Sequence, residues 1–125
     1  MRLSIIVAAL EGCSFEQIDD ADRVDRALRE AVAAGGFTLL HQHVHKFSPQ
    51  GVTGAAVLSE SHIALHSWPE DGVLFVDIAT CSGTAATQAA FDAICANFDH
   101  TTIKRQDLGY QTPMASVAAV DLQCQ

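Results

Sequence analysis

An amphipathic helical pattern in the first third of the chain restricts the fold more than any other feature. It begins at Asp19 or Asp20, either of which can cap a helix, and ends at Gly35 and Gly36. Between them, apolar residues recur with the spacing i, i+3, i+4, i+7 and i+8: Val24, Ala27, Leu28, Ala31 and Val32. Charged residues lie off this stripe. Such a helix needs an apolar partner layer to cover its stripe.

The partner layer is predicted from strand-length segments on both sides of the helix. The segments lie at residues 3–10, 38–47, 52–58, 63–67, 73–80 and 101–108, and turn-forming stretches at 48–51 and 69–72 separate some of them. A second helix is expected to begin with Thr84 as its cap and to place Phe91, Ile94, Cys95 and Phe98 on one face. This order predicts an α+β fold, a two-layer sandwich with an antiparallel sheet covered on one face by two helices.

Length and composition narrow the function classes. The chain has 125 residues, of which 49% are hydrophobic and 18% charged, as expected for a single domain over residues 1–125 with a filled core. The net charge of −8 and the lack of a basic stripe argue against nucleic acid as a partner. The short apolar run at the start resembles a strand, so we expect no signal peptide and no membrane span. Scattered cysteines without CxxC spacing favour the reducing cytoplasm.

The most informative segment runs from Leu58 to Cys81 and reads LSESHIALHSWPEDGVLFVDIATC. It contains a Glu60-Ser61-His62 triplet, a histidine at His66 within HSWPE, and Cys81 within ATC. Together with the preceding FSPQGVTGAAV, this segment resembles the prokaryotic S-adenosylmethionine decarboxylase family, whose members cleave themselves and depend on a pyruvoyl group. The termini match the family's pattern less well, which leaves the substrate more open than the cofactor.

The resemblance implies a role for each matching residue. Cleavage is expected between Glu60 and Ser61, and Ser61 becomes the pyruvoyl group that forms a Schiff base with the substrate amine. His66 is the implied processing base, Cys81 the implied proton donor in decarboxylation, and Thr53, where the family usually has serine, the implied processing aid. Substrate binding is assigned to Phe47 and Trp68 as stacking partners of an adenine and to Glu70 as an acceptor from a ribose hydroxyl. A homodimer with shared active sites is also implied, and neither a metal nor pyridoxal phosphate is expected.

Elementary chemistry agrees with these roles. The Ser61 hydroxyl can attack the preceding carbonyl and turn the amide into an ester if the turn is strained and the oxyanion is stabilised. A base then removes the Ser61 α-proton, and elimination leaves dehydroalanine, which hydrolyses to a pyruvoyl group and ammonia. His66 lies five residues away, and an odd spacing places two side chains on opposite faces of a straight strand. This interpretation therefore requires a bend or bulge between Ser61 and His66.

Several alternatives remain open at this stage. The same chemistry on ornithine or arginine would need only a different pocket, and a homologue that does not cleave itself would serve as a partner subunit. His41, His43 and His45 alternate along one strand and raise the third alternative, a small metal-binding domain. Structural roles also compete with the catalytic ones: Ser61 as a turn residue, His66 as a core histidine and Cys81 as a small buried hydrophobe.

Overall fold

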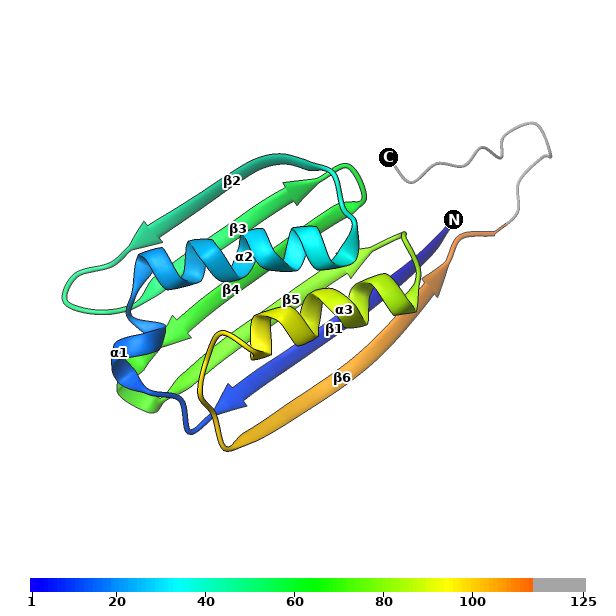
Figure 1. Ribbon diagram of the computed structural model, residues 1–125. Coiled ribbons are helices and arrows are strands. Elements are labelled where there is room, and N and C mark those ends of the chain that lie inside the picture. Colours follow the sequence, from blue (N-terminus) through cyan, green and yellow to red (C-terminus); the bar gives the residue numbers. More distant parts are fainter. Residues whose placement is uncertain (114–125) are drawn as a thin grey trace.

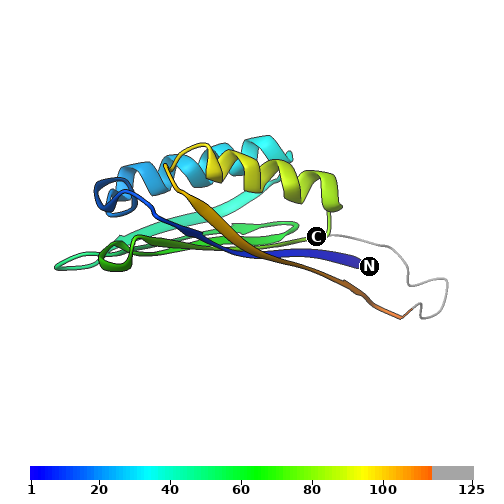
Figure 2. The same cartoon turned by 90° about the horizontal axis from the view of Figure 1, so that it is seen from below.

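A computed structural model describes residues 1–113, in which six strands form one antiparallel sheet in the order β2-β3-β4-β5-β1-β6 (Figure 1). The helices gather on one side of this sheet, and no other part of residues 1–113 covers the opposite side (Figure 2). The predicted fold class is confirmed. The elements are β1 (Arg2–Glu11), α1 (Phe15–Ile18), α2 (Ala21–Gly35), β2 (Leu39–Lys46), β3 (Val52–Leu58), β4 (Ser61–Trp68), β5 (Val73–Thr80), α3 (Thr84–Cys95) and β6 (Thr102–Gln111), with a 3-10 turn at Pro69–Asp71.

Helix α2 begins and ends where its sequence predicts. The Asp20 carboxylate accepts hydrogen bonds from the backbone N–H groups of Asp22 and Arg23, at 3.0 and 3.2 Å. At the other end Gly36 adopts φ 68°, the left-handed conformation that glycine takes without strain. All five residues of the predicted apolar stripe are buried.

The start of α3 and the number of helices differ from the prediction. Thr84 is the first helical residue of α3 rather than its cap; Gly83 occupies the cap position and offers no side chain to do so. The short helix α1 was not predicted, because four residues carry too little periodicity to be recognised. Ser14 caps it through a 3.4 Å hydrogen bond from the Gln17 N–H.

The core lies between the sheet and the helices. Alternate residues of β1, β3, β4 and β5 point into it, including Leu10, Val52, Leu65 and Leu74, each at most 1% exposed. Gly54 lets α2 approach β3 closely, since a Cβ at this position would lie 2.8 Å from Leu28 Cδ1. Residues in the opposite phase form what we call the open face: Ile5, Val7, Thr53, Ala55, Val57, His62, Ala64, His66, Trp68, Phe75, Asp77, Leu108 and Tyr110.

Within residues 1–113, no helix combines the length and the apolar character needed to cross a membrane. Cys124, which carried no functional prediction, lies outside the described residues.

Candidate active site

The predicted cleavage point lies in the tight turn between β3 and β4. Leu58 pairs with Ser61, so the turn consists of Ser59 and Glu60 alone. Ser61 adopts φ 139°, and it is the one residue other than glycine with a positive φ among residues 1–113. An L-residue with a side chain rarely takes this conformation, at a cost of about 1–3 kcal/mol. The backbone is therefore strained at the residue whose hydroxyl is predicted to attack.

The carbonyl of Glu60, which that hydroxyl would attack, faces Cys81 at the end of β5. The Cys81 backbone N–H donates to the Glu60 carbonyl oxygen at 3.2 Å, and the Cys81 sulfur lies 3.5 Å from the same oxygen. A donor in this position stabilises negative charge that develops on the oxygen during attack. Cys81 is disulfide-bonded in the structure, so a role as proton donor requires reduction of its sulfur to the thiol.

The Glu60 side chain is held from the opposite side by Thr38, the residue before β2. The Thr38 N–H donates to Glu60 Oε1 at 2.9 Å and the Thr38 hydroxyl donates to Oε2 at 3.2 Å. The sequence analysis missed Thr38. It lies 22 residues from Glu60 and belongs to no motif, so the sequence carries no signal for it.

The other predicted residues meet at the far end of the β3–β4 hairpin. A cavity of about 340 Å³ is lined there by the two processing candidates Thr53 and His66 and by the three binding candidates Phe47, Trp68 and Glu70. Thr53 Oγ1 and His66 Nδ1 lie 3.2 Å apart, and the His66 and Trp68 ring centroids are 6.3 Å apart. Trp68 and Phe47 are 45% and 47% exposed, which leaves their ring faces available to a ligand.

This cavity is anchored by a carboxylate that the sequence analysis assigned only to a helix end. Asp19 accepts a 2.8 Å hydrogen bond from the Gly51 N–H and lies 3.1 Å from the Lys46 ammonium. The Gly51 hydrogen bond is the main reason that the pKa of Asp19 lies below its ordinary value, and Lys46 lowers it further. These contacts fix the loop between β2 and β3, which carries Phe47.

The structure does not bring Ser61 and His66 together within one chain. The strand register runs from Ser61 to His66 without a shift, so the bend expected between them is absent and that expectation was wrong. Five residues of extended strand separate the two positions by about 16 Å. We therefore distinguish two half-sites at opposite ends of the hairpin: the cleavage half-site (Glu60, Ser61 and Cys81) and the aromatic half-site (Phe47, Thr53, His66, Trp68 and Glu70).

The three alternating histidines lie on the open face of the edge strand β2, opposite Val57, Ala55 and Thr53. Within residues 1–113, no group of three or more His, Cys, Asp or Glu residues is arranged to hold a metal ion. The geometry therefore gives the metal-binding alternative no support. Elsewhere on the open face, His62 Nε2 lies 3.4 Å from Asp77 Oδ2.

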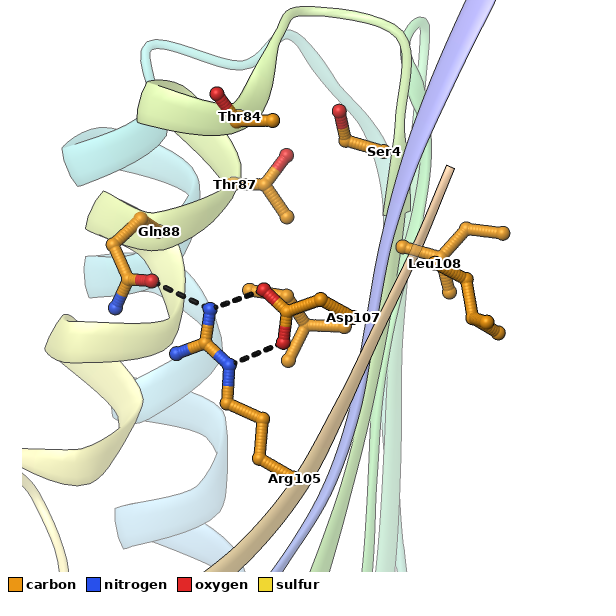
Figure 3. Close-up of a pocket in the computed structure, with 9 residues that line it drawn as sticks. Ser4, Thr84, Thr87, Gln88, Arg105, Asp107 and Leu108 are labelled. Carbon is orange, nitrogen blue, oxygen red and sulfur yellow. Dashed lines mark hydrogen bonds and ion pairs between the residues drawn. The ribbon is translucent and has the colours of Figure 1, made fainter. Parts of the chain in front are cut away.

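A smaller cavity of about 90 Å³ lies between α3 and the strands β1 and β6 (Figure 3). Arg105 spans it, donating through Nη2 to Gln88 at 2.6 Å and through Nη2 and Nε to the Asp107 carboxylate at 2.7 and 2.6 Å. None of the predicted site residues lines this cavity. The Arg105–Gln88 hydrogen bond links α3 to the edge strand β6, and Asp107 on the same strand holds the guanidinium in place.

Comparison with known proteins gives a consistent family. The family model described as S-adenosylmethionine decarboxylase matches residues 4–109. A protein of Methanococcus maripaludis named S-adenosylmethionine decarboxylase proenzyme is 51% identical over 76 residues, which are 61% of this chain and 62% of that protein's length. A proenzyme of the same name from Methanococcus aeolicus is 42% identical over 105 residues, 80% of this chain and 90% of that protein.

The fold comparison agrees with the sequence comparison. The crystal structure of the adenosylmethionine decarboxylase from Aquifex aeolicus superposes with a TM-score of 0.81 at 30% sequence identity, covering 92% of this chain and 93% of that one. The family model covers most of the chain, and the Methanococcus aeolicus relative is similar over four fifths of it. The chain therefore belongs to the S-adenosylmethionine decarboxylase family.

Proposed function

We propose that the protein is a self-cleaving, pyruvoyl-dependent decarboxylase that acts on S-adenosylmethionine and so supplies the aminopropyl donor of polyamine biosynthesis. The proposal treats residues 1–125 as a single domain that is cut between Glu60 and Ser61. The observation that carries it is the strained turn, in which Ser61, at φ 139°, follows a carbonyl that already accepts the Cys81 N–H. The two Methanococcus relatives are both named as proenzymes, which supports self-processing.

The residues of the cleavage half-site suit the formation of a pyruvoyl group from Ser61. Strain at Ser61 raises the energy of the uncut chain, and the Cys81 N–H offsets the charge that forms on the Glu60 oxygen during attack. Once formed, a pyruvoyl group supplies an electron sink in place of pyridoxal phosphate. The Cys81 sulfur lies 3.5 Å from the Glu60 carbonyl oxygen and, once reduced to the thiol, is the proposed proton donor. A thiol is maintained in a reducing compartment, which supports the cytoplasm as the proposed location of the active protein.

The separation of the half-sites supports a homodimer. Thr53, His66 and Trp68 of the aromatic half-site are in the open-face phase of their strands. Cys81 directly follows the core-facing Thr80 and so continues the open-face phase at the opposite end of the sheet. A two-fold pairing of open faces would set the cleavage half-site of one copy against the aromatic half-site of the other. The open face also exposes Val57, Leu108 and Tyr110 at 48 to 57%, an apolar surface that a second copy would bury.

The aromatic half-site fits an adenosyl group better than a small basic amino acid. Phe47 and Trp68 present aromatic rings to the cavity for stacking, and the Glu70 carboxylate lies beside them to accept from ribose hydroxyls. Ornithine has no planar group to stack, and the arginine guanidinium, which can stack on a ring, is smaller than an adenine. S-adenosylmethionine is therefore the favoured substrate.

The first test is a denaturing intact-mass spectrum of the purified protein and of a Ser61→Ala variant. Two fragments, ending at residue 60 and beginning with a pyruvoyl-blocked residue 61, are expected from the unmodified protein, and one uncut chain from the variant. Carbon dioxide release is then compared for S-adenosylmethionine, ornithine and arginine, with dithiothreitol present to reduce Cys81. An uncut unmodified protein would favour the partner-subunit alternative, and preference for a basic amino acid would correct the substrate.

The shared site is tested by co-expressing Ser61→Ala and His66→Ala chains that carry different affinity tags. Neither variant is expected to cleave alone. In the mixed dimer the His66→Ala chain keeps Ser61 and receives an intact His66 from the other copy, so cleavage of that chain alone is expected. No cleavage in isolated mixed dimers would show that the two half-sites do not combine in this way.

A further inference from the structure

Thr38, which is not among the predicted site residues, holds the scissile turn by hydrogen bonds that we call the clamp. Thr38 makes three hydrogen bonds to the two turn residues: two from its N–H and hydroxyl to the Glu60 carboxylate, and a third in which its carbonyl accepts the Ser59 N–H at 3.0 Å. The turn thus joins β3 and β4 through the chain and is tied to the start of β2 through Thr38.

Glu60 is held on both flanks. Its carboxylate is bound by Thr38 on the β2 side, and its carbonyl is bound by the Cys81 N–H on the β5 side at 3.2 Å. A two-residue turn has few ways to relax when one of its residues is fixed at both ends. A strained backbone conformation persists only where surrounding contacts hold it in place. The strained residue here is Ser61, which directly follows Glu60.

From this arrangement we infer that Thr38 is a positioning residue for self-cleavage, which acts by holding Glu60 so that the scissile carbonyl stays against the Cys81 N–H and next to the Ser61 hydroxyl. The inference rests on the proposed function. This role of Thr38 also explains the use of a glutamate before the cleavage point. Its carboxylate has two acceptor oxygens, which can bind the Thr38 N–H and the Thr38 hydroxyl at the same time.

Thr38→Val is the matched test because it removes the hydroxyl and nearly preserves the shape. Thr38→Ser keeps the hydroxyl. Thr102→Val is the control, since it removes a comparable 3.2 Å hydrogen bond from a threonine hydroxyl to a carboxylate, that of Glu11, away from the turn. Precursors are made by timed in vitro translation, and the rate of appearance of the fragments is followed by gel electrophoresis.

Self-cleavage of Thr38→Val is expected to slow about tenfold, the scale of one hydrogen bond to a charged group, while Thr38→Ser and Thr102→Val cleave at nearly the unmodified rate. The thermal midpoints of the Thr38→Val and Thr102→Val precursors, each carrying Ser61→Ala to prevent cutting, should agree. A common loss of stability would therefore not account for the difference.

A second variant changes Glu60, the residue that accepts the Thr38 hydrogen bonds. Glu60→Gln replaces one acceptor oxygen by a donor and should slow cleavage as well, and adding Thr38→Val to it should slow cleavage by much less than in the unmodified chain. Unchanged cleavage in Thr38→Val, or fully independent effects of the two substitutions, would overturn the inference while the proposed function stands. An unmodified protein that never cleaves would overturn both.

Discussion

Replacing Ser61 by glycine rather than by alanine should stabilise the uncut protein. Both substitutions remove the nucleophilic hydroxyl, so both chains should stay uncut, and they differ in how they tolerate φ 139°. Alanine keeps a Cβ and its steric penalty, about 1–3 kcal/mol in such a region. Glycine has no Cβ, but its unfolded chain is more flexible, which costs about 0.5–1 kcal/mol. The difference predicts a net advantage for Ser61→Gly of about 1 kcal/mol.

Thermal and guanidinium unfolding of the two variants, followed by circular dichroism at equal protein concentration, would measure this advantage. For a chain of this length about 1 kcal/mol corresponds to a rise in Tm of about 3–5 °C. Gly83→Ala in the Ser61→Ala background is a useful reference, because Gly83 also has a positive φ, 102°, and no atom lies within 4 Å of an added Cβ. That substitution should therefore destabilise through backbone strain alone. Equal stability of Ser61→Gly and Ser61→Ala, or greater stability of the alanine variant, would refute the argument that Ser61 is strained.

Three further predictions concern groups outside the turn. Asp19→Asn should lower the free energy of unfolding at neutral pH. Because folding lowers the pKa of Asp19, its carboxylate stabilises the folded state at pH values above the ordinary pKa of 3.8. This stabilisation is lost as the pH falls through the folded pKa. Urea unfolding at pH 7 and pH 3 measures the difference in unfolding free energy between the variant and the unmodified protein, which should be smaller at pH 3. An equal difference at both pH values would contradict the prediction. Gly54→Ala should destabilise by about 1–3 kcal/mol, because the added Cβ would lie 2.8 Å from Leu28 and 3.0 Å from Val24, and a Tm equal to that of the unmodified protein would show that α2 can move away. Burial raises the pKa of Cys95 to about 11, so roughly one molecule in a thousand carries the thiolate at pH 8. Peptide mapping after iodoacetamide treatment should therefore find Cys95 nearly unlabelled. Rapid labelling of the folded protein would show that the thiol is accessible.

The elements of the fold were predictable because they depend on short-range patterns. The stripe of α2 repeats within a few residues, and its ends carry the cap Asp20 and the terminator Gly36. Strand β3 was predicted with its observed bounds because turn residues precede it and Ser59 follows it. Thr84 was misassigned because a hydroxyl residue at a helix start resembles a cap, whereas Gly83 takes the cap position at φ 102°.

The sequence predicted which residues belong to the candidate site but not how they are arranged in space. The motif around Ser61 named both half-sites, but the odd spacing to His66 suggested a bend, whereas the unbroken register of β4 places the two residues at opposite ends of the strand. A spacing rule cannot reveal whether such a conflict is resolved by a bulge or by a second copy of the chain. Thr38 was missed for a different reason, since its contact with Glu60 spans 22 residues and depends on how β2 joins the sheet.

The strain at Ser61 is a property of the uncut precursor. The strain depends on a continuous chain through residues 60 and 61, because φ of Ser61 is defined across the bond that cleavage breaks. Cutting that bond releases the strain, so the cleaved form does not carry the cost that the uncut form does. A substitution that relieves the strain at Ser61, such as Ser61→Gly, should thus stabilise the uncut form while it abolishes cleavage, a trade-off between stability and function located at a single residue.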